Sequence, residues 1–145
     1  MNQAQSFTLL LVEDDTADAH LTRMAFEEGR VAVDLRHVEN GEQALDYLHQ
    51  RGAYEQAPRP DLILLDLNMP RMDGRQFLVS IKKLDAFKTI PVVVLTTSDA
   101  ESDVIASYSE GASGYIVKPV NIDRFIQQIR KLEDYWFTLV KRPSY

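Results

Sequence analysis

Three consecutive acids, Glu13, Asp14 and Asp15, follow directly on an apolar run at residues 7–12. Adjacent carboxylates repel one another, so they are costly to collect at one point. A divalent cation would remove this cost, because Mg²⁺ binds one or two carboxylates and keeps room for a phosphate oxygen. Asp15 can instead cap a following helix. We therefore interpret Glu13 and Asp14 as a metal-binding pair and leave Asp15 open between the metal and the cap.

Three further polar residues stand at the ends of later apolar runs. Asp66 ends the run in "LLDLNMP", Thr96 ends "VVVLT", and Lys118 follows "GYIV". If these runs are parallel strands, their carboxyl ends meet at one edge of a sheet, where ligands of such folds bind. A carboxylate there could accept a phosphoryl group while a metal and a lysine neutralise the developing charge.

The elements that would position these residues follow from the apolar pattern. Continuous β-rich runs predict strands buried on both faces at 7–12, 33–38, 61–65, 91–95 and 114–117. Helical periodicity predicts helices at 16–28, 43–50, 73–84 and 99–110, and a last helix beginning near Asn121. Gly111 is expected as a left-handed C-cap, and residues 51–61 as a surface loop. Strand and helix therefore alternate, which predicts an α/β fold with helices on both faces of a parallel sheet.

Composition bounds the class of protein. A chain of 145 residues, 45% of them apolar, has the size of one domain with a substantial core. It has no cysteine for disulfides or thiolate metal sites. We expect a cytoplasmic protein, since no apolar run reaches the roughly 18–20 residues of a membrane span and the N-terminus lacks the basic start of a secretion signal. The net charge of −6 argues against nucleic-acid binding.

Four segments, "VEDD", "LLDLNMP", "LTTS" and "GYIVKP", resemble in order and position the receiver domains of two-component response regulators. The resemblance covers roughly residues 7–132 and leaves a C-terminal helical extension at 133–145. It implies one flavodoxin-like receiver domain over 1–145, with a five-stranded sheet of strand order 2-1-3-4-5, five helices and a long last helix. It also implies a signalling protein that a histidine kinase phosphorylates on Asp66, not an enzyme that turns over an external substrate.

The same resemblance implies a role for each site residue. Mg²⁺ would be held by Glu13, Asp14, Asp66 and the backbone carbonyl of Asn68, and Mn²⁺ or Ca²⁺ could replace it in a crystal. Thr96 would contact the phosphoryl group, Lys118 would pair with it, and the Lys118–Pro119 bond would be cis. Tyr115 would be an aromatic switch that turns inward with Thr96 on phosphorylation; alternatively, it is a fixed core or interface aromatic. His20, His37 and His49 lack metal-ligand spacing and are interpreted as surface or packing residues.

The last helix carries an apolar stripe that can be explained in two ways. Its members are Phe125, Ile129, Leu132, Trp136 and Leu139. The stripe could pack into the core of its own domain. We favour a homodimer through the face of helix four, strand five and helix five, with Phe125, Ile129, Leu132, Trp136 and Phe137 at the interface. The "YWF" ending and the long loop before "LILLDLNMP" resemble stand-alone receivers associated with phytochrome-type kinases, and so imply such a kinase as partner.

Other functions remain open at this point. The protein could be a phosphorelay intermediate or phosphate sink that passes the phosphoryl group to a histidine phosphotransfer protein. A phosphatase of the haloacid-dehalogenase kind also uses an aspartyl phosphate, but Asn68 stands where such enzymes carry a second acid. A flavin carrier would need a hydroxyl- and glycine-rich loop where this chain has Glu13, Asp14 and Asp15.

Overall fold

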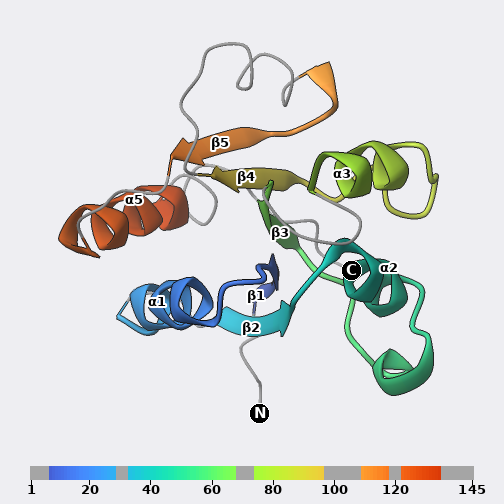
Figure 1. The fold of residues 1–145 in the computed structure, drawn as a ribbon, viewed down its shortest axis with the longest axis horizontal. Coiled ribbons are helices and arrows are strands. Elements are labelled where there is room, and N and C mark those ends of the chain that lie inside the picture. Colours follow the sequence, from blue (N-terminus) through green and yellow to red (C-terminus); the bar gives the residue numbers. More distant parts are fainter. Residues whose placement is uncertain (1–6, 29–32, 68–73, 97–108, 118–121, 135–145) are drawn as a thin grey trace.

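A five-stranded parallel sheet forms the centre of the protein (Figure 1). The computed structural model describes residues 7–28, 33–67, 74–96, 109–117 and 122–134. The strands are β1 (Phe7–Val12), β2 (Val33–Val38), β3 (Leu62–Asp66), β4 (Val92–Thr96) and β5 (Gly114–Val117). Their order is β2-β1-β3-β4-β5, and all neighbours are parallel. The doubly wound α/β fold is thus confirmed; β3 and β4 begin and end one residue later than expected.

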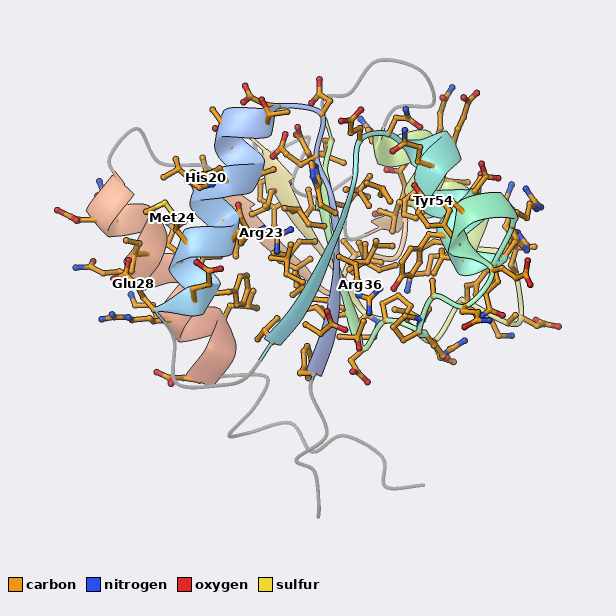
Figure 2. All side chains as sticks on the ribbon, turned by 90° about the horizontal axis from the view of Figure 1, so that it is seen from below. His20, Arg23, Met24, Glu28, Arg36 and Tyr54 are labelled. Carbon is orange, nitrogen blue, oxygen red and sulfur yellow. The ribbon has the colours of Figure 1, made fainter. Side chains whose placement is uncertain are left out.

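Helices cover both faces of this sheet. They are α1 (Thr16–Glu27), α2 (Gly41–Leu48), α3 (Gly74–Lys82) and α5 (Ile122–Asp134). Figure 2 views the sheet along its edge, with α1 and α5 on one face and α2 and α3 on the other. Residues 99–108, most of the remaining expected helix, lie outside the described residues. Gly111, which follows it, has the expected positive φ of 109°.

Each face of the sheet has its own apolar layer, because successive strand side chains point to opposite faces. The layer under α2 and α3 includes Leu10, Val12, Ile63, Leu65, Phe77 and Ile81. The layer under α1 and α5 includes Leu9, Leu11, Leu64, Leu95, Phe26 and Ile129. Burying one such side chain contributes about 1.5–3 kcal/mol. The central strands β1, β3 and β4 are apolar at nearly every position because both of their faces are covered, whereas the edge strand β2 is mostly half-buried and carries Asp34, Arg36 and His37.

Side-chain capping explains why α2 begins two residues before the position expected. Asn40 accepts a hydrogen bond from the Gln43 amide at 2.8 Å, and Gln43 Oε1 accepts one from the Glu39 amide at 2.8 Å. The Asn40 bond caps the helix, because it satisfies an amide that the first helical turn leaves unpaired, and Gln43 reaches back to Glu39, one residue before the cap. The helix therefore starts at Gly41, two residues before the expected start at Gln43.

The loop between α2 and β3 is folded back onto α2. It contains a short 3-10 helix, η1 (Gly52–Tyr54). Tyr47 Oη donates to the carbonyl of Pro58 at 2.8 Å, and Gln50 Nε2 donates to the carbonyl of Ala57 at 2.9 Å. Arg51 and most of its neighbours are exposed, as expected for a surface loop, but these two bonds hold its second half against the domain.

Two residues of the apolar stripe, Ile129 and Leu132, pack inward in the described part of α5, and Ile129 requires a correction of the expected dimer interface. Ile129 has no exposed surface, and Ile126 and Leu132 pack against the same core layer beside α1. Ile129 is therefore a core residue and not part of a dimer interface. The Phe125 side chain, Trp136 and Phe137 lie outside the described part of the chain. Within that part, none of the helices has the length and apolar character needed to span a bilayer.

Candidate metal centre

The strand register brings the predicted site residues to one edge of the sheet. Val12, the last residue of β1, lies opposite Leu65, so Glu13 follows beside Asp66. Asp66 in turn pairs with Leu95, and Thr96 is the next residue of β4. Asp66 and Thr96 are the last residues of β3 and β4, each one residue beyond the expected strand range and at the predicted end of its apolar run. The polar residues of segments far apart in the sequence thus lie together at the carboxyl ends of the strands.

Glu13, Asp14 and Asp66 form an acidic trio, in which one carboxylate oxygen from each lies within 4.8 Å of the others. Glu13 has no exposed surface and Asp66 only 4%, whereas Asp14 is exposed. Burial removes the water that would otherwise solvate these charges, and neighbouring carboxylates repel one another. A cation bound by all three would offset both costs, and the exposed side of Asp14 leaves a path to solvent.

Asp15 does not belong to this trio but caps α1. Its Oδ1 accepts hydrogen bonds from the amides of Ala17 at 2.9 Å and Asp18 at 3.1 Å. Its own amide donates to Glu13 Oε2 at 3.3 Å. The open question about Asp15 is therefore resolved in favour of the cap. Asp15 contacts the trio through its backbone amide, which binds Glu13, and not through its carboxylate.

Two further hydrogen bonds hold the backbone of Glu13. Its amide donates to the Val38 carbonyl at 3.0 Å, which extends the β1–β2 ladder one residue beyond the strand. Its carbonyl oxygen lies 2.7 Å from His37 Nε2. A carbonyl can only accept, so this ring nitrogen must carry a proton and donate. His37 was expected to be a surface or packing residue. Its contact with Glu13 could not be predicted from the sequence, because only the register of β2 beside β1 creates it.

Gly74, another residue that the sequence analysis missed, supports Asp66 from the side of α3. A Cβ atom at this position would overlap the Asp66 carbonyl oxygen and come within 2.6 Å of Leu67 Cα. The Gly74 amide donates to the Leu67 carbonyl at 3.2 Å. Only glycine allows this approach of helix to strand. The one sequence signal is a glycine after "RMD", which also suits an ordinary turn.

The remaining predicted residues are placed only in part. Tyr115 on β5 is half-buried and packs against the apolar layer under α2 and α3. Asn68, Lys118 and the Lys118–Pro119 bond lie outside the described residues, as does the side chain of Thr96.

A doubly wound parallel sheet with an acidic trio at the carboxyl ends of β1 and β3 defines a domain of the receiver class. Comparison with known proteins agrees: the family model described as response regulator receiver domain matches residues 9–130. The chain belongs to this family. It is thus a response regulator. The family match favours this assignment over a haloacid-dehalogenase-like phosphatase or a flavin carrier.

Several relatives resemble the chain over nearly its whole length. Response regulator Rcp1 from Synechocystis sp. is 42% identical over 136 residues, which cover 94% of this chain and 92% of Rcp1. The Mn²⁺-bound structure of Rcp1 has a TM-score of 0.86 and 42% identity, and covers 94% and 99% of the two chains. The phosphorylated cyanobacterial phytochrome response regulator RcpA has a TM-score of 0.90 and 41% identity, and covers 97% and 100%.

Proposed function

We propose that this response regulator accepts a phosphoryl group on Asp66 from a phosphohistidine of a phytochrome-type histidine kinase. The observation that carries the proposal is the acidic trio, with Asp66 at the end of the central strand β3 and its carboxylate beside those of Glu13 and Asp14. The likeness to RcpA, a phosphorylated phytochrome response regulator, supports both the acceptor chemistry and the class of kinase.

The trio suits Mg²⁺ as the cofactor. All three ligands are carboxylate oxygens, which hard divalent cations prefer, and the exposed side of Asp14 leaves room for water or a phosphoryl oxygen. Mn²⁺ has the same ligand preference, and the Mn²⁺-bound form of Rcp1 supports a divalent site. When bound, Mg²⁺ supplies positive charge that offsets the charge on the transferring group. Asn68 is proposed to complete the site through its backbone carbonyl.

The transfer is a displacement at phosphorus in which Asp66 is the nucleophile. One Asp66 oxygen forms a bond to phosphorus while the bond to the kinase imidazole nitrogen breaks, and the imidazole keeps the electron pair. Lys118 and the hydroxyl of Thr96 are proposed to contact the phosphoryl oxygens. Positioning and charge neutralisation are most of what a protein supplies in such a transfer.

The output is proposed to be a change in binding surface. Phosphorylation would draw Thr96 toward Asp66 and let Tyr115 move further into the layer that it already contacts. The region of β5 and α5 would then pair with a second copy, with Phe125, the partly buried Leu132, Trp136 and Phe137 as the remaining interface candidates. A phosphorelay intermediate or phosphate sink is the other role, for which the output surface is not required.

Phosphotransfer to Asp66→Asn tests the acceptor. The purified chain is incubated with Mg²⁺ and either acetyl phosphate or a phosphorylated kinase, and the phosphoprotein is separated on a phosphate-affinity gel. We expect the variant to accept no phosphoryl group, whereas Asp46→Asn, which changes a half-exposed acid of α2 that pairs with Arg51, behaves as wild type. Full labelling of Asp66→Asn would disprove the assignment. The lifetime of the phosphoryl group and its transfer to a histidine phosphotransfer protein separate output from relay.

A further inference from the structure

The peptide unit that joins Glu13 to Asp14 is held by a side chain from the neighbouring strand. Its carbonyl oxygen accepts the hydrogen bond from His37 Nε2 at 2.7 Å. Because a peptide unit is planar, the direction of this oxygen also sets the positions of the Asp14 nitrogen and Cα. The bond therefore controls the direction in which Asp14 leaves the end of β1, toward or away from Asp66.

The position of His37 on β2 makes this contact specific. Leu35 packs into the layer under α1 and α5, and His37, two residues later, faces the same side of the sheet. The β1–α1 connection begins on that side. The neighbour Arg36 points to the opposite side, toward α2 (Figure 2). Its positive charge there lowers the pKa of Tyr47, against the larger opposite effect of burial. His37 is half-buried, so its bond to the Glu13 carbonyl is partly shielded from competing water.

Three of the interactions of Glu13 are hydrogen bonds to known partners: its amide donates to Val38, its carboxylate accepts from the Asp15 amide, and its carbonyl accepts from His37. The first two use backbone groups of their partners, which most substitutions leave in place. The third depends on the side chain of His37 and is lost when that residue is replaced. His37 is thus a position at which the geometry of the trio can be changed without removing a carboxylate.

We propose that His37 is a positioning residue of the metal centre, which orients the Glu13–Asp14 peptide so that both acids face Asp66. The inference rests on the proposed function, since it assigns His37 to the same cation site. Groups that hold metal ligands from outside the coordination sphere typically contribute about 10- to 100-fold to metal affinity. His37 acts on the backbone of its ligands, so we expect about a 5- to 20-fold effect.

Mg²⁺ binding by isothermal titration calorimetry tests this role in the full-length chain. His37→Leu removes the donor at similar volume, and we expect its Kd for Mg²⁺ to rise about 5- to 20-fold. The phosphorylation rate should fall at low Mg²⁺ and return near the wild-type rate at saturating Mg²⁺. His37→Gln keeps an amide donor and should recover most of the affinity. If His37→Leu does not fold, His37→Asn replaces it, because its shorter amide does not reach the carbonyl.

Tyr47→Phe is the matched control. It also removes a donor to a backbone carbonyl, that of Pro58, but on the other face of the sheet and outside the trio. It should lower the melting temperature and leave the Kd for Mg²⁺ unchanged. Unchanged Mg²⁺ affinity in His37→Leu, or equal weakening in Tyr47→Phe, would overturn the positioning role. A wild-type chain that binds no Mg²⁺ would overturn the metal site and this role together, whereas one that binds Mg²⁺ but takes no phosphoryl group would overturn only the proposed transfer.

Discussion

Gly74, the first residue of α3, lies against the carbonyl of Asp66 so closely that no Cβ atom fits between them. The contact joins the start of a helix to the end of the central strand. It makes the direction of the Asp66 backbone, and hence of its carboxylate, depend on a residue without a side chain. Stability and phosphorylation should therefore respond together to a change at Gly74.

Gly74→Ala should destabilise the protein and impair phosphorylation of Asp66. The added methyl group must displace either the Asp66–Leu67 backbone or the start of α3, and such overpacking typically costs about 1–3 kcal/mol. Urea unfolding and acetyl-phosphate labelling measure the two effects. Gly52→Ala is the control: its φ of 56° makes alanine strained, but nothing lies within 4 Å of the new Cβ. It should lose about 1 kcal/mol and keep normal labelling. Equal labelling of both variants would contradict the proposed contact.

Asp14 and Asp15 should respond differently to alanine. Asp14→Ala removes a ligand of the trio, so Mg²⁺ binding and phosphorylation should both fall strongly. Asp15→Ala removes the cap of α1 and should cost about 0.5–2 kcal/mol of stability. Its backbone amide still reaches Glu13, so Mg²⁺ affinity should stay near that of the wild type. Calorimetry with Mg²⁺ and thermal unfolding distinguish the two; equal losses of affinity would place Asp15 in the metal site.

Metal removal should reverse the stability order of wild type and Asp14→Asn. When a chelator removes the metal, the three carboxylates of the wild type repel one another. The asparagine variant lacks one of these charges and should therefore melt at a higher temperature than the wild type. Mg²⁺ at about 100 times its Kd should stabilise the wild type by about 2.7 kcal/mol. The variant should gain much less. A melting curve that does not respond to Mg²⁺ in the wild type would argue against the site.

Tyr47→Phe should change the alkaline limit of stability. Burial raises the pKa of the Tyr47 phenol above its ordinary 10.0, and its side chain is only 3% exposed. The folded state therefore keeps this proton longer than the unfolded state, so stability present below pH 10 is lost as pH rises through the folded-state pKa. At neutral pH the variant should be about 1 kcal/mol less stable, since the Pro58 carbonyl loses its donor. That difference should shrink above pH 10 in urea unfolding; a constant difference would contradict it.

Removal of the residues after Asp134 should weaken self-association if the C-terminal extension forms a dimer. The shortened chain keeps all of α5, including the buried Ile129. Sedimentation of phosphorylated and unphosphorylated full-length and shortened chains measures the effect. Loss of the dimer with unchanged thermal unfolding would support a role of Trp136 and Phe137 at the interface. An unchanged dimer would exclude the extension.

The order of strands and helices was predictable from the sequence, because burial on two faces and helical periodicity leave different apolar patterns. The Asp66 and Thr96 positions at strand ends followed from the same pattern. Boundaries shifted where local hydrogen bonds competed, as at Gly41, where the side chain of Asn40 caps α2 and starts it early. The acids could be recognised as a candidate site because parallel strands bring them together at a cost in repulsion, which a bound cation would offset.

The sequence by itself determined the fold class and the acids from which the metal centre is built, since both depend on residue type and short-range spacing. Only the tertiary structure decided that Asp15 caps a helix and that Ile129 faces the core. It also decided that His37 contacts the backbone of Glu13 and that Gly74 contacts the backbone of Asp66. These outcomes depend on strand register and on how closely helices approach the sheet. Contacts between distant residues leave no periodic pattern in the chain that makes them.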